Sequence, residues 1–150
     1  YFRSDLFSLP EAEHVIVHEF GHIVDLGGLQ SADFFQKSVF VDGHIPLFVD
    51  DPSVDFYQIS WKKNDQWNRG SSKKDFVSGY AATDPFEDFA ESFLLYQREG
   101  ETFHALAQRN DRLQEKYDFF RDHVFGGEEF RGKPVVISMN DRPWDATKMK

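Results

Sequence analysis

The chain has 150 residues, of which 40% are hydrophobic and 17 are phenylalanine, which argues against disorder and provides enough apolar volume for one folded domain. Its formal net charge of −9 argues against nucleic acid and anionic membrane surfaces as partners, because both carry negative charge. The sequence has no cysteine, which excludes a thiol nucleophile and a Cys-ligated metal. No apolar run reaches the roughly 18 residues of a membrane span.

The first predicted element is a helix from about Leu9 to Leu26. Ser8 and Glu11 have the spacing of a capping box, in which each side chain binds a free backbone N–H at the start of the helix. Glycines at residues 27–28 end the helix. An apolar face of alanine, valine and isoleucine indicates that one side of this helix is buried.

This helix contains the motif H-E-F-G-H at residues 18–22. Residues four apart lie on one helical face, so His18 and His22 can bind one ion. Glu19 then lies beside the metal and can act as the general base, taking a proton from a water molecule that the metal activates. The helical context makes a chance match rare, so we expect a zinc site here.

Two further residues of this helix bear on the site. Gly21 costs about 1 kcal/mol against alanine inside a helix, so its presence beside a ligand indicates close approach of another backbone or side chain. Asp25 lies seven positions after His18, on nearly the same face and one turn past the metal. That position suits an acceptor for a hydrogen bond from a ligand histidine rather than a ligand.

The middle of the chain, from Leu29 to Gly79, has weaker patterns. We expect two short strands around a turn, a further extended segment and then a polar loop: Val39–Val41, Ile45–Val49, Phe56–Trp61 and Lys62–Lys74. These few short strands favour a mainly helical domain of the α+β type.

A second helix is predicted from Asp84 to Arg98, with Asp84 as N-cap and Pro85 at the first helical position. A third helical region follows from about Thr102 to Phe125, with a bend near residues 110–111. Residues 133–139 are expected to form a strand or an extended tail. Apolar residues recur at helical spacing in the second helix, so one of its faces is expected to be buried.

The second helix offers the third metal ligand that a catalytic zinc site needs. The longer motif H-E-x-x-H-x-x-G-x-x-H is excluded, because Asp25 and Gly28 stand at its glycine and last histidine. Glu87 and Glu91 lie four apart on one face of the second helix. One can bind the metal while the other accepts a hydrogen bond from a ligand imidazole; alternatively, both belong to a solvated acidic stripe.

The two motif segments, residues 18–25 and 87–93, resemble the catalytic domain of anthrax lethal factor and its relatives, which include the clostridial Pro-Pro endopeptidases. In that group the first helix reads H-E-x-G-H-x-x-D, the third ligand opens an E-x-x-A-E segment, and a tyrosine precedes that ligand by seven. The resemblance implies Glu87 as the third ligand, Glu91 as the partner of a ligand histidine and Tyr80 as the group that stabilises the oxyanion. The alternative for Tyr80 is a ring that packs under the helix N-terminus.

We therefore expect one zincin-like metallopeptidase domain over residues 1–150, mainly α (α+β), with one Zn²⁺ held by His18, His22 and Glu87. The start at Tyr1 indicates a piece of a longer protein. The predicted activity is that of a gluzincin endopeptidase; the alternative is a catalytically silent zinc-binding or toxin-accessory module. A peptide or protein substrate, a monomeric state and a secreted or extracellular location complete these expectations.

Overall fold

The computed structural model describes residues 9–29, 36–131 and 143–144. This part of the chain is mainly helical, as the sequence predicts, and includes two small antiparallel sheets of two strands each. In chain order its elements are α1 (Leu9–Ile23), η1 (Val24–Gly28), β1 (Lys37–Asp42), β2 (Ile45–Phe48), α2 (Pro52–Ser60), β3 (Trp61–Lys63), β4 (Gln66–Trp67), η2 (Lys73–Asp75), α3 (Pro85–Arg98), α4 (Gly100–Ala107), α5 (Asp111–Phe119) and η3 (Phe120–Val124). Within the described residues, no helix is long and apolar enough to cross a membrane.

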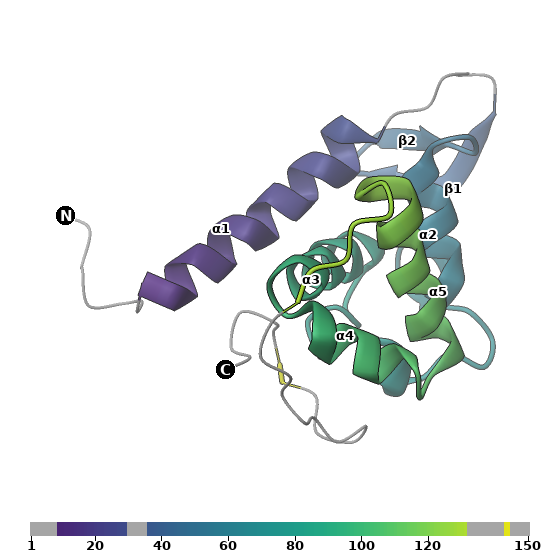
Figure 1. The fold of residues 1–150 in the computed structure, drawn as a ribbon. Helices are drawn as coiled ribbons and strands as arrows, with labels where there is room; N and C mark the ends of the chain where they lie inside the picture. The colour runs from purple at the N-terminus through teal and green to yellow at the C-terminus, as the bar shows by residue number, and fades with distance from the viewer. Residues whose placement is uncertain (1–8, 30–35, 132–142, 145–150) are drawn as a thin grey trace.

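Figure 1 shows α1 along one side of the molecule, with α2, α4 and α5 gathered on the other side. Helix α1 packs mainly against α3. A methyl group at Gly21 would lie 3.0 Å from the Cα of Ala90, so the close approach predicted at this glycine is confirmed. The α-helical part ends at Ile23, earlier than predicted, and continues as the π-helical turn η1. Ser8, half of the predicted capping box, lies outside the described residues.

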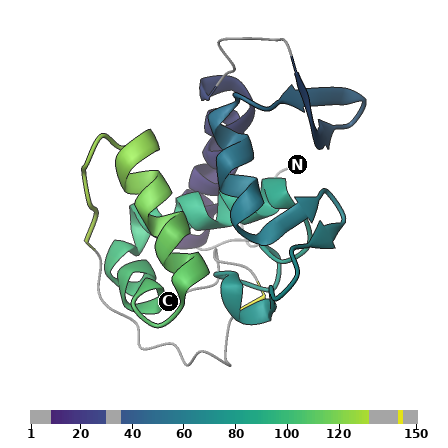
Figure 2. The same cartoon turned by 90° about the vertical axis from the view of Figure 1, so that its right-hand side faces the viewer.

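The hairpin of β1 and β2 forms where two strands and a turn are predicted. Its two strands are joined by Gly43 and His44, and Gly43 has a φ of 60°, a conformation that glycine adopts without strain. Phe40 and Leu47 point into the core. Figure 2 shows that this hairpin projects beyond the helices.

The prediction of an extended segment at residues 56–61 is wrong, because most of these residues belong to helix α2. Asp51 caps this helix, its side chain accepting a hydrogen bond from the N–H of Ser53, and Pro52 occupies the first turn. The predicted loop at residues 62–74 contains the short hairpin of β3 and β4.

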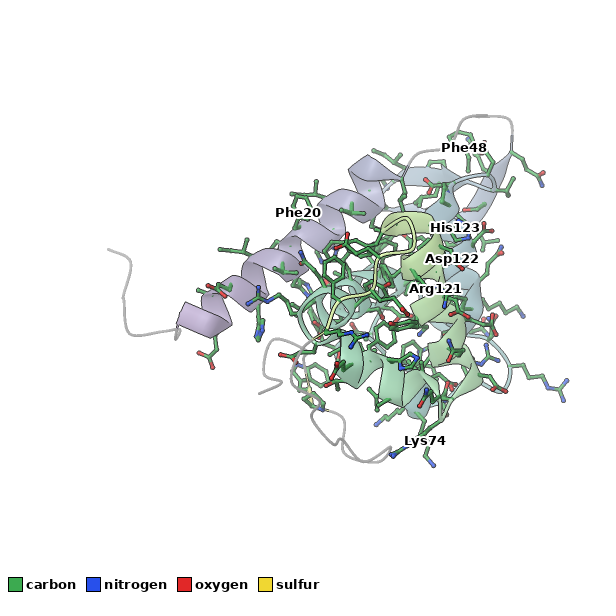
Figure 3. All side chains as sticks on the ribbon, viewed as in Figure 1. Phe20, Phe48, Lys74, Arg121, Asp122 and His123 are labelled. Carbon is green, nitrogen blue, oxygen red and sulfur yellow. The ribbon has the colours of Figure 1, made fainter. Side chains whose placement is uncertain are left out.

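Helix α3 is central, and its side chains are buried almost continuously from Asp88 to Tyr96. Asp84 caps it, as predicted, and accepts a hydrogen bond of 2.9 Å from the N–H of Glu87. The cap therefore fixes the backbone of the predicted third ligand. Figure 3 shows the dense packing of side chains around this helix.

The predicted third helical region consists of α4, α5 and the π-helical turn η3. The predicted bend near residues 110–111 is where Asn110 caps α5, accepting a hydrogen bond from the N–H of Leu113. The predicted extended tail at residues 133–139 lies outside the described residues.

A buried ion pair joins α3 to α5. The Nζ of Lys116 lies 2.8 Å from the Asp88 carboxylate, and both side chains are fully buried. Trp61 also donates a hydrogen bond to Asp88, and Lys116 lies 4.2 Å from the centre of the Phe76 ring. Burial of two charges is costly unless they are paired and hydrogen-bonded, as these are. The pair holds α3 against the aromatic core immediately after Glu87.

Candidate metal centre

His18 and His22 of α1 and Glu87 of α3 converge where the two helices pack together. The Oε2 atom of Glu87 lies 3.1 Å from the Nε2 atom of His18 and 3.4 Å from the Nε2 atom of His22. One possible ligand atom from each of the three side chains lies within 4.8 Å of the others. Among the described residues this is the group of histidine and acidic side chains that could hold a metal ion.

These distances can be compared with those around a zinc ion. Tetrahedral zinc with bonds of about 2.0–2.2 Å places its ligand atoms roughly 3.3–3.6 Å apart. The separation of Glu87 from His22 is of this size, and its separation from His18 is somewhat shorter. The Oε2 atom of Glu87 is buried and has no hydrogen-bond partner among the described residues. A buried carboxylate oxygen this close to two imidazole nitrogens can form ion pairs with protonated imidazoles or share a bound cation with neutral ones.

The ionisable side chains of this cluster strongly shift the pKa values of one another. Burial lowers the pKa of His18, but the Glu87 and Glu91 carboxylates outweigh it and raise this pKa to about 9. Burial raises the pKa of Glu87, but the two histidines outweigh it and hold this pKa at about 2. Glu87 raises the pKa of His22, against burial, and the charge of Glu19 adds to the effect. The site therefore favours a negative Glu87 facing positive charge.

Glu91 contacts the far side of His18. Its Oε2 atom lies 3.0 Å from the Nδ1 atom of His18, and its side chain is fully buried. The other oxygen accepts a hydrogen bond of 2.9 Å from the hydroxyl of Ser78, which itself accepts one from the N–H of Ala81. A carboxylate in this position fixes the ring of His18 and leaves its Nε2 atom to face Glu87.

Tyr80 lies over the same histidine. The rings of Tyr80 and His18 are stacked with centroids 6.0 Å apart and an interplanar angle of 17°. Burial and, next, the negative charge of Glu87 raise the pKa of Tyr80 to about 12, so its phenol is protonated at neutral pH. A protonated phenol beside the three possible ligands can donate a hydrogen bond to an oxygen atom bound there.

Of the other two predicted residues, Asp25 lies apart from this cluster and Glu19 lies at its edge. The Asp25 carboxylate is fully buried and accepts hydrogen bonds of 2.6 and 2.7 Å from the hydroxyl of Tyr57. These bonds join the end of α1 to α2, and the predicted bond from a ligand histidine to Asp25 stays a prediction. Glu19 is exposed on α1, next to His18 in the sequence.

Ser78 and Tyr57 were not predicted from the sequence, because no motif or spacing links either of them to a ligand.

Comparisons with models of protein families, with curated proteins and with solved structures find no match to this chain.

Proposed function

We propose that this protein is a zinc-dependent endopeptidase of the gluzincin type, with a zincin-like catalytic domain. The observation that supports it most is the convergence of His18, His22 and Glu87, which together could hold one metal ion. The resemblance of the two motif segments to the lethal factor group adds the reaction class.

In this proposal three side chains hold Zn²⁺ and leave one position open, as catalytic zinc sites do. Zinc, when bound, supplies Lewis-acid chemistry that makes water a stronger nucleophile at neutral pH. Glu19 takes the proton of the attacking water and passes it to the leaving amine. Its exposure on α1 suits this role, because a general base must be reachable by water and substrate.

The remaining groups orient the ring of His18 and stabilise the oxyanion. Glu91 holds the ring of His18 through the Nδ1 atom, and Ser78 holds Glu91 in turn. Tyr80 donates a hydrogen bond to the oxyanion that develops on the substrate carbonyl. Its phenol does this without bringing a charge into the site, since its pKa of about 12 keeps it protonated at neutral pH.

The test combines zinc analysis with cleavage of a random peptide library by the wild type and by Glu19→Gln. The wild type is expected to bind one zinc ion and to cleave peptides. The variant should keep its fold and its zinc but lose about 10²–10⁴-fold in turnover, which is the usual contribution of a general base.

Two outcomes would contradict the proposal. Zinc binding without cleavage by either protein would instead favour a silent zinc-binding module. Loss of zinc in a folded Glu19→Gln variant would mean that Glu19 is a ligand or a structural residue.

A further inference from the structure

The two residues Pro143 and Trp144 lie against the segment that carries Tyr80. The N–H of Gly79 donates a hydrogen bond of 3.0 Å to the carbonyl oxygen of Pro143, and the N–H of Tyr80 donates one to the carbonyl oxygen of Trp144. Two consecutive backbone amides next to the proposed oxyanion donor are thus held by a distant part of the chain.

The indole of Trp144 also contacts this segment. Its ring centroid lies 6.2 Å from that of Tyr80, within the range of an attractive aromatic pair. Tyr80 in turn stacks on His18. The Tyr80 ring therefore has aromatic neighbours from two separate segments, one of which carries a proposed metal ligand.

Gly79 shows how closely the indole approaches. A methyl group at this position would lie 2.7 Å from the Cε3 atom and 3.2 Å from the Cζ3 atom of Trp144. The φ angle of Gly79 is not positive, so other residues can adopt its backbone conformation. Among the described residues, the three atoms nearest to such a methyl group all belong to Trp144. Gly79→Ala is therefore a specific probe of this contact.

We propose that Trp144 is a positioning residue for Tyr80. Its carbonyl oxygen fixes the Tyr80 backbone and its indole limits the orientation of the phenol above His18. The inference rests on the proposed function, in which that phenol faces the oxyanion. Trp144 is 66% exposed, so its removal takes little apolar surface out of the core. An effect on turnover can thus be separated from an effect on folding.

The contact itself is tested in the metal-free protein by hydrogen exchange of the Tyr80 amide, measured by NMR. Trp144→Ala keeps the carbonyl oxygen that accepts this hydrogen bond but removes the ring contact that holds it in place. Trp144→Ala and Gly79→Ala should therefore each speed this exchange by about tenfold, as expected when one hydrogen bond is lost with the contact. Gly79→Ala should have no further effect in a Trp144→Ala background. Ile45→Ala, at a residue of similar exposure on β2, is the control and should leave the exchange unchanged. Unchanged exchange in Trp144→Ala, or equal effects of Gly79→Ala in both backgrounds, would overturn the proposal.

The role in catalysis is tested by turnover. Trp144→Ala should keep its zinc content and KM but lose about 10–100-fold in kcat, a loss typical of a misplaced catalytic group. Trp144→Phe should recover most of this loss, because it keeps a ring on Tyr80. In a Tyr80→Phe background, Trp144→Ala should lower kcat no further.

The outcomes separate this proposal from the proposed function. A wild type and a Trp144→Ala variant of equal kcat, with Tyr80→Phe impaired, would overturn the positioning role alone. A wild type that cleaves no peptide would overturn the peptidase and, with it, the effect of Trp144 on catalysis.

Discussion

Glu87 and Glu91 stand one helical turn apart on α3 and have different surroundings. Glu87 faces both histidines, and one of its oxygens has no hydrogen-bond partner in the part of the chain that the structure describes. Glu91 instead contacts His18 and Ser78 with its two oxygens. Glu87→Ala should therefore weaken zinc binding more than Glu91→Ala. Loss of the Glu91 contact should cost about 10–100-fold in zinc affinity, as for other partners of ligand histidines.

Competition against a chromophoric chelator measures these affinities. Glu87→Gln and Glu91→Gln, which keep the side-chain size, are the matched controls for cavity effects. A Glu87→Ala variant with wild-type zinc affinity, together with a Glu91→Ala variant that binds none, would reverse the two roles.

Tyr80 is tested by removal of a single oxygen atom. Tyr80→Phe keeps the ring that stacks on His18 and on Trp144, so stability and zinc content should not change. If the phenol acts mainly in the transition state, kcat and kcat/KM should fall together by about 10²–10³-fold. Steady-state kinetics with a cleaved library peptide measure both. Near-normal turnover would leave Tyr80 as a packing residue.

At the scale of elements, the contact between α1 and α3 depends on Gly21. Alanine at this position should favour the isolated helix by about 1 kcal/mol. In the folded protein, however, its methyl group would lie 3.0 Å from the Cα of Ala90 and push the two helices apart. We expect Gly21→Ala to lower the free energy of unfolding by about 1–3 kcal/mol and to weaken zinc binding, because the ligands come from both helices.

Urea denaturation and zinc titration test this expectation. Gly27→Ala is the matched control, since a methyl group there would lie within 4 Å of no described atom apart from its chain neighbours and the adjacent backbone of its own helix. If Gly21→Ala were as stable and as tightly zinc-binding as the wild type, the helix contact would not depend on this glycine.

The same sequence signal begins two helices, and only one of them was predicted. Asp84 and Pro85 start α3, and Asp51 and Pro52 start α2. Residues 56–61 were expected to form an extended segment, but α2 packs against α3 and α5, which buries Phe56 and Tyr57. The cap at Asp51 and the burial against α3 and α5 thus both favour the helix over an extended segment.

At the scale of the whole molecule, the mainly helical fold was predicted from helix caps and the helical spacing of apolar residues. The residues of the candidate site were predicted from two short motifs and the resemblance that these motifs carry. Helical spacing alone brings His18 and His22 to one face, and the N-cap at Asp84 places Glu87 in the first turn of α3. The contacts of Ser78, Tyr57 and the Pro143–Trp144 segment could not be predicted. They join residues far apart in the sequence, and no local pattern encodes such a pair.

Stability should depend on pH through Asp25. Burial raises the pKa of this carboxyl group to about 7, against the hydrogen bonds from Ser53 and Tyr57, whereas in the unfolded chain it titrates near its ordinary value of 3.8. Between these values the folded state holds more protons than the unfolded state. The contribution of Asp25 to the free energy of unfolding should therefore fall as the pH rises from about 4 to about 7.

Asp25→Asn removes this titration. The free energy of unfolding of the wild type minus that of the variant, from urea denaturation at each pH, should decrease across this window by a few kcal/mol at most, on the order of 1.4 kcal/mol per unit. Asp55→Asn changes an exposed carboxylate of α2 and is the control for the loss of one negative charge. A flat difference for Asp25→Asn would mean that Asp25 does not control the pH dependence.

The two helices that carry the proposed ligands, α1 and α3, pack together, but α3 is synthesised well after α1. Glu91 follows His18 by 73 residues. At about 5–20 residues per second, roughly 4–15 s pass on a ribosome between them. During that interval the nascent chain carries two histidines on a helix whose Phe20, labelled in Figure 3, has no partner yet, because Phe93, whose ring lies 6.1 Å away, is still to be made. If the protein binds zinc as proposed, capture of the metal is therefore a late event that follows the synthesis of α3.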